Sequence, residues 1–99
     1  MLHEFVLEAI ANGYESFECV VEQVTRWGRV RDRAFTHEEI AKALESAIGE
    51  GYAQAYLLSP QPPHTKQVAF SHELLGEIYF YVTRQGKQLV KDLEDQIEG

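Results

Sequence analysis

The densest group of side chains that could bind an anion is a short run of arginines. Arg26, Arg29, Arg31 and Arg33 lie within eight residues, and guanidinium groups form paired hydrogen bonds with phosphate oxygens. The spacing therefore predicts a phosphate-contacting cluster. The sequence leaves one alternative open, which is an exposed loop whose arginines pair with the chain's own carboxylates.

No other group of residues indicates catalysis. The chain has no nucleophile beside a base, no glycine-rich phosphate loop and no catalytic pair of carboxylates at a recognisable spacing. His64, His72 and Glu73 fall in one segment, but their spacing matches no known set of metal ligands. We therefore predict a protein that is not an enzyme, with no catalytic residue, no metal and no cofactor.

Aromatic side chains form a second group with binding chemistry. Aromatic rings can stack on nucleic-acid bases or on a ligand. Packing in a core or across paired strands explains most of them more simply. The residues concerned are Trp27, Tyr14, Tyr52, Tyr56, Tyr79 and Tyr81.

The charge balance bears on the choice of partner. The formal net charge is −7, and residues 1–25 carry five acidic residues without any Lys or Arg. Affinity for phosphate comes from clustered Lys and Arg, so the overall balance argues against a nucleic-acid partner. The run of arginines is the exception to this balance.

Three amphipathic helices are predicted in the first half of the chain. Apolar residues recur at helical spacing over residues 2–10, 17–27 and 40–48. Ser16 is the expected N-cap of the second helix, and Gly28 is expected to end it. Thr36 and Glu39 form the capping box that begins the third helix. Cys19 lies beside the apolar stripe of the second helix and is expected to be a buried thiol.

Two strands and a last helix are predicted in the second half. Residues 52–58 and 78–83 have the alternation and residue types of strands, and a long proline-containing connection separates them. Thr83 is the expected N-cap of a helix that ends near Ile97, and Gly86 is expected where this helix passes close to the sheet. We therefore predict one mainly α-helical domain of the α+β class over residues 1–99, with three helices, a two-stranded antiparallel hairpin with a long loop, and a C-terminal helix.

Two stretches resemble bacterial winged-helix transcriptional regulators, a superfamily that includes the PadR and MarR types. FTHEEIAKALESAIGEGYAQAYL is similar to their third helix and the strand after it, and YFYVTRQGKQLV is similar to their second wing strand and exit helix. The resemblance implies a winged helix-turn-helix fold in which the hairpin is the wing. It also implies transcriptional control, with the third helix in the major groove of DNA and the wing on the backbone.

The DNA-contacting residues that this reading implies lie on three parts of the chain. The arginine run gives Arg26, Arg29, Arg31 and Arg33. The third helix with the predicted wing gives Thr36, His37, Lys42 and Lys66, and the start of the last helix gives Arg84 and Lys87.

The sequence also departs from the family pattern. The polar face of the third helix has Glu38, Glu39 and Glu45 against a single Lys42, and acidic groups are repelled by a groove lined with phosphates. The alternative function is a non-enzymatic winged-helix module for protein–protein interaction, with an acidic third helix that does not bind DNA.

Location and assembly complete the expectations. No signal-peptide pattern and no apolar run long enough to span a membrane is present, and the single cysteine excludes an internal disulfide. We therefore expect a cytoplasmic protein without a membrane partner.

Related regulators dimerise through flanking helices, and the apolar stripes of the first and last helices reach almost to the chain ends. We therefore expect a homodimer whose interface uses the first helix, the last helix or both. The alternative is that these two helices pack on each other within one chain.

Overall fold

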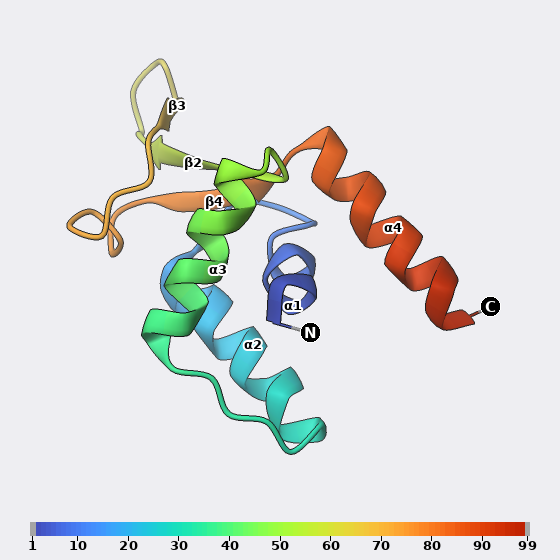
Figure 1. Ribbon diagram of the computed structural model, residues 1–99. Helices are drawn as coiled ribbons and strands as arrows, with labels where there is room; N and C mark the ends of the chain where they lie inside the picture. The colour runs from blue at the N-terminus through green and yellow to red at the C-terminus, as the bar shows by residue number, and fades with distance from the viewer. Residues whose placement is uncertain (1, 99) are drawn as a thin grey trace.

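The computed structural model describes the backbone of residues 2–98 and the side chains of residues 2–93. Over this range the fold is of the α+β class, with four helices and one four-stranded antiparallel sheet (Figure 1). The elements in chain order are α1 (Leu2–Ala9), β1 (Glu15–Ser16), α2 (Phe17–Val30), α3 (His37–Gly49), β2 (Ala53–Leu58), β3 (Thr65–Val68), β4 (Tyr79–Val82) and α4 (Arg84–Glu98).

The helices begin at the N-caps that the sequence predicts. The Ser16 hydroxyl accepts a hydrogen bond from the Cys19 backbone N–H at 3.2 Å. At the start of α3, the Thr36 hydroxyl accepts from the Glu39 N–H at 3.1 Å, and the Glu39 carboxylate accepts from the Thr36 N–H at 2.9 Å. The capping box is thus complete, and it supplies partners for two donors that every helix N-terminus leaves free.

Two predictions about α2 are wrong. Gly28 does not end this helix, which continues to Val30. The glycine is needed because the following loop folds back on it, so that a Cβ at this position would lie 2.7 Å from the Arg33 carbonyl oxygen. Cys19 is exposed because it lies beside the buried stripe and points away from it.

The sheet is larger than the predicted two-stranded hairpin. The expected pair is present, because β2 and β4 are antiparallel neighbours with Ala55 opposite Phe80. Two further strands give the order β1-β4-β2-β3. The unpredicted β3 forms inside the long connection, where the Ser59 N–H bonds to the His64 carbonyl at 2.9 Å and closes a turn. The unpredicted β1 is a two-residue strand that pairs with β4.

The core lies between the inner face of this sheet and the helices. Alternate strand residues point inward, so Ala53, Ala55, Phe80 and Val82 are buried. The helix α1 contacts α2, α3 and α4, and its apolar residues are buried well beyond a single stripe, Leu7 included. The core is therefore centred on α1, and the opposite sheet face remains without a covering helix (Figure 1).

The start of α4 is fixed against the end of α3. The Thr83 hydroxyl donates to the Gly51 carbonyl at 2.6 Å and accepts from the Gly86 N–H at 3.1 Å, as expected of an N-cap. A Cβ at Gly86 would overlap the Tyr52 carbonyl oxygen and a Val82 methyl group. The predicted close approach at Gly86 is therefore confirmed.

Candidate interaction surfaces

The predicted phosphate-contacting arginines lie at the end of α2 and in the loop that follows. Arg29, Arg31 and Arg33 are exposed, whereas Arg26 forms an ion pair with Glu22 one helical turn earlier at 3.4 Å. The Arg31 guanidinium lies 5.7 Å from the centroid of the Phe5 ring, a distance at which a cation is attracted to an aromatic face. Pairing with the chain's own carboxylates is therefore seen for Arg26, and phosphate contact by Arg29, Arg31 and Arg33 stays a prediction.

The loop owes its shape to local backbone bonds. The N–H groups of Arg31 and Arg33 both donate to the Gly28 carbonyl, at 3.0 and 2.7 Å. Between them Asp32 has a φ of 58°, in the left-handed region that Asp tolerates better than most side chains. This tight turn ends α2 and leaves the arginine side chains on the outside.

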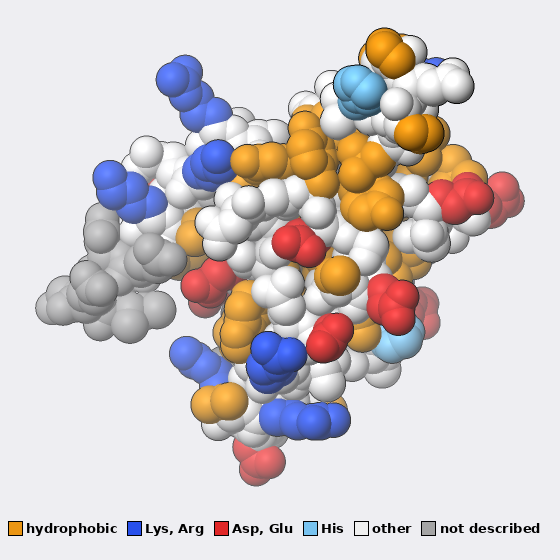
Figure 2. Space-filling model, turned by 180° about the vertical axis from the view of Figure 1, so that it is seen from behind, with side chains coloured by type: hydrophobic (Ala, Val, Ile, Leu, Met, Phe, Trp, Pro, Cys, Tyr) orange, Lys and Arg blue, Asp and Glu red, His pale blue; other side chains and the backbone are white. Residues whose placement is uncertain are grey.

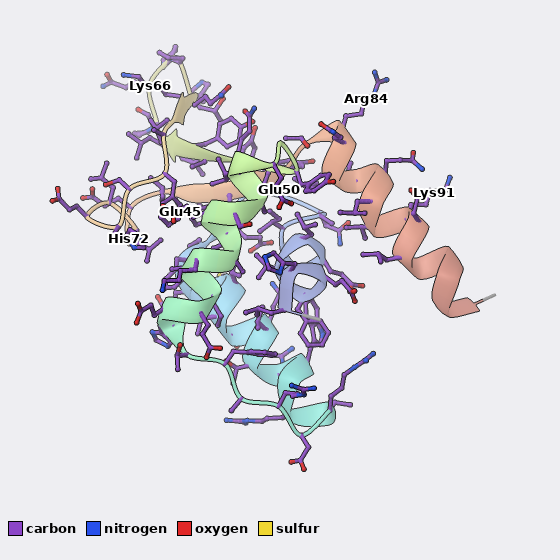
Figure 3. The ribbon with its side chains drawn as sticks, in the orientation of Figure 1. Glu45, Glu50, Lys66, His72, Arg84 and Lys91 are labelled. Carbon is purple, nitrogen blue, oxygen red and sulfur yellow. The ribbon has the colours of Figure 1, made fainter. Side chains whose placement is uncertain are left out.

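The outer face of α3 is acidic. Its Lys42 ammonium lies 3.5 Å from the Glu38 carboxylate, so this lysine neutralises an acid of its own helix. Glu45 is exposed and lies 3.9 Å from the His72 imidazole of the loop before β4, as the labelled side chains in Figure 3 show. The exposed carboxylates of Glu38 and Glu45 thus outnumber the single lysine of this face, which keeps a net negative charge.

The start of α3 is occupied by its own capping groups. The hydrogen bond from the Thr36 backbone N–H, followed by that with the Thr36 side chain, lowers the pKa of Glu39 below its usual value of 4.5. His37 packs edge-on against the Phe17 ring at 6.1 Å. Thr36 and His37, the two predicted DNA-contacting residues at this helix end, are exposed. Each also has a structural role, Thr36 as the N-cap and His37 against the Phe17 ring.

The ten predicted DNA-contacting residues do not form one surface. The turn between α2 and α3, which holds the arginines, lies at the end of the molecule away from the sheet (Figure 1). Lys66 on β3 and Arg84 at the start of α4 lie near the opposite end and on different sides of it (Figure 3). Positive charge is thus divided among the arginine turn, β3 and the first turns of α4.

A cluster of three tyrosines lies next to the first turns of α4. The sequence analysis named all three among the residues that could stack on a ligand, but it did not bring them together as one site. The Tyr14 ring packs edge-on against Tyr56 at 5.2 Å and against Tyr81 at 4.9 Å. The Lys87 ammonium lies 5.2 Å from the Tyr81 ring centroid. These residues, with Val82 and Arg84, line an open depression of about 390 Å³. Burial, followed by the nearby Tyr14 and Tyr81 hydroxyls, raises the pKa of Tyr56.

Among the residues that the structure describes, no three His, Cys, Asp or Glu side chains are grouped so that they could hold a metal ion. Within the described helices, none combines the length and the apolar character that crossing a bilayer requires.

Comparison with known proteins gives no relative for this arrangement. No protein-family model, no curated protein and no solved structure matches the chain.

Proposed function

We propose that this chain is a winged-helix-type domain that acts as a non-enzymatic protein interaction module and docks the acidic face of α3 onto a basic partner. The order of elements supports the winged-helix part. Three helices precede β2, β3 and β4, with the two-residue β1 between α1 and α2, and α4 follows β4. The sequence resemblance around α3 and β4 supports the same assignment.

The observation that carries the proposal is the charge on α3. In a DNA reader this helix enters a groove lined with phosphates, but here its exposed face presents Glu38 and Glu45, and its Lys42 is paired with Glu38. The same carboxylates attract a basic protein surface. Complementary charge of this kind increases the association rate and selects the partner.

The test uses a labelled lysine- and arginine-rich helical peptide as the basic probe. We expect the double variant Glu38→Gln/Glu45→Gln to weaken binding about fivefold or more, since exposed charge pairs contribute up to about 1 kcal/mol each. The matched control, Glu8→Gln/Asp92→Asn, removes the same charge from α1 and α4. Equal losses in both variants would show unspecific attraction to an acidic protein and would overturn the proposal.

DNA binding is the second candidate, and one observation favours it. Arg29, Arg31 and Arg33 are exposed in the segment that leads to α3, whose helix dipole adds partial positive charge at its N-terminus. If these arginines contact phosphates, changing all three to Gln lowers the slope of log affinity against log salt by about 0.9 for each lost contact. An unchanged slope in an anisotropy titration with duplex DNA sinks this candidate.

One variant separates the two functions. Removing the α3 carboxylates in Glu38→Gln/Glu45→Gln strengthens DNA binding, because a repulsion is lost, but weakens binding of the basic peptide.

We also propose a cytoplasmic location and a homodimer. The location is supported by a lone cysteine, Cys19, which is exposed as a free thiol and is compatible with a reducing compartment.

A further inference from the structure

The outer face of the sheet carries a rigid aromatic surface that has no part in the function proposed for α3. Tyr56 and Tyr81 lie on neighbouring strands, and Tyr14, from the segment before β1, lies between their rings. Tyr14 remains 42% exposed. Each ring is held by perpendicular ring contacts, and the Tyr56 hydroxyl donates to the Gln54 side chain at 3.2 Å. Such a surface loses little side-chain entropy when a ligand binds.

Among the described residues, the basic side chains that flank this tyrosine cluster lie on its α4 side. Arg84 and Lys87 line the same depression, and within the described residues neither forms an ion pair with a carboxylate. Figure 2 shows hydrophobic side chains gathered next to Lys and Arg side chains on this face. In a chain with a net charge of −7, this is a local positive site that attracts an acidic group.

The pattern of charge selects among three classes of ligand. A nucleic-acid strand needs cations along the whole line of stacked bases, because it has a phosphate at every step, and here cations lie at one end alone. A small molecule needs a pocket that encloses most of its surface, and this depression is open. An extended peptide fits both the open aromatic surface and the basic end.

We propose that the tyrosine cluster is a docking site for an acidic, proline-containing linear segment of a partner protein. Proline-rich segments form a preorganised left-handed helix whose rings pack on aromatic grooves with little loss of entropy. Prolines of the segment lie against Tyr14, Tyr56 and Tyr81, and a carboxylate of the segment pairs with Arg84 and Lys87. This site is separate from the acidic face of α3, so neither proposal depends on the other.

The test uses a fluorescein-labelled peptide in which Pro-Pro and Glu-Glu pairs alternate. Tyr14→Ala and, separately, Arg84→Glu/Lys87→Glu are each expected to weaken binding about tenfold. The control Arg29→Glu/Arg33→Glu makes the same charge change at the arginine turn and leaves the affinity within about twofold, since exposed charges a Debye length or more away are screened. Thermal denaturation of each variant checks that it is folded.

Three outcomes would overturn the proposal. The first is an equal loss in the two charge-reversal variants, which indicates unspecific attraction. The second is tighter binding of a neutral peptide copied from residues 59–64 of this chain, which points to a second copy as the occupant. The third is tighter binding of a single-stranded oligonucleotide. The variant Glu38→Gln/Glu45→Gln separates this proposal from the one for α3. If Tyr14→Ala lowers the affinity for the Pro/Glu peptide and Glu38→Gln/Glu45→Gln does not, the tyrosine site is supported even when α3 fails to bind the basic peptide.

Discussion

At the scale of single residues, two threonines begin helices in different surroundings. Thr36 is exposed, and its bonds are to its own helix: the capping box with Glu39 and the Ile40 N–H that donates to its carbonyl. Thr83 is half-buried, bonds to Gly86 in α4 and to Gly51 beyond the end of α3, and its backbone N–H donates to the Tyr52 carbonyl at 3.0 Å. The first threonine therefore stabilises one helix, whereas the second joins two parts of the fold.

Replacing Thr36 isolates the value of the capping box. We predict that Thr36→Ala lowers the free energy of unfolding by about 1 kcal/mol, because the Glu39 N–H loses its acceptor. Thr36→Ser keeps the hydroxyl and serves as the control. Chemical denaturation measures both variants, and a midpoint for Thr36→Ala equal to that of the parent would show that the hydroxyl does not stabilise α3.

The partner carboxylate in the box makes the stability depend on pH. The pKa of Glu39 is lowered in the folded chain, first by the backbone hydrogen bond from Thr36. A lowered pKa means that the stabilisation is fully present above the unfolded value of about 4.5 and is lost as the pH falls through the folded value. We predict that Glu39→Ala is less stable than the parent at pH 7, and that denaturation curves at pH 3 show a smaller difference. A constant difference would contradict this.

At the scale of elements, the sequence predicted the parts whose signals are local. The helices α2 and α3 begin at side-chain caps, and β2 and β4 have the residue types of strands. The short β3 gives no such signal, because the residues of Thr65–Val68 are mostly exposed and form a strand only by pairing with β2. Gly28 was misassigned for a similar reason, since its role depends on a loop that returns from Arg33.

The candidate sites show the same limit. The arginine turn was visible in the sequence because its members are neighbours in the chain. The tyrosine cluster was not, because Tyr14 meets Tyr56 and Tyr81 only after β1, β2 and β4 have paired in their register. The sequence also cannot show that three positively charged groups lie on separate parts of the surface. These groups are Lys66, the arginine turn and Arg84 (Figure 1, Figure 3).

The turn after α2 gives a prediction at this scale. Asp32 has a φ of 58°, where a β-branched side chain is strained. We predict that Asp32→Val lowers the free energy of unfolding by about 1–2 kcal/mol, whereas Asp32→Gly is neutral or slightly stabilising. Thermal or chemical denaturation measures both. If the Val and Gly variants unfold with equal free energies, Asp32 does not adopt the left-handed conformation.

At the scale of the whole molecule, charge and apolar surface are arranged on different faces. The acidic face of α3, the arginine turn and the tyrosine cluster with its basic flank are three distinct surfaces, built from a chain with one core. An acidic protein repels most acidic partners, so a local basic flank beside aromatic rings restricts where such a partner can bind.

Among the side chains that the structure describes, the two helices that could form a dimer interface differ in how much apolar surface they leave exposed. The expected homodimer uses α1, α4 or both, but α1 contacts α4 within the chain, and Phe5, Val6 and Leu7 of α1 are already buried. The apolar stripe of α4 includes Leu89, Val90 and Leu93, all half-buried. The further stripe residue Ile97 lies outside the side chains that the structure describes. Of the two helices, α4 therefore has the apolar surface that a second copy can cover.

We predict a homodimer in which the apolar stripe with Leu89, Val90 and Leu93 packs against a second copy, because apolar side chains that one chain leaves half-exposed are stabilised when a symmetry mate buries them. Leu93→Asp places a charge in that contact and shifts the equilibrium toward monomer, whereas Asp92→Leu, one position away on the exposed side, does not. Sedimentation equilibrium over a hundredfold range of concentration measures both. A parent protein that remains monomeric throughout this range contradicts the dimer, and with it any binding to a two-fold symmetric DNA site that requires two copies.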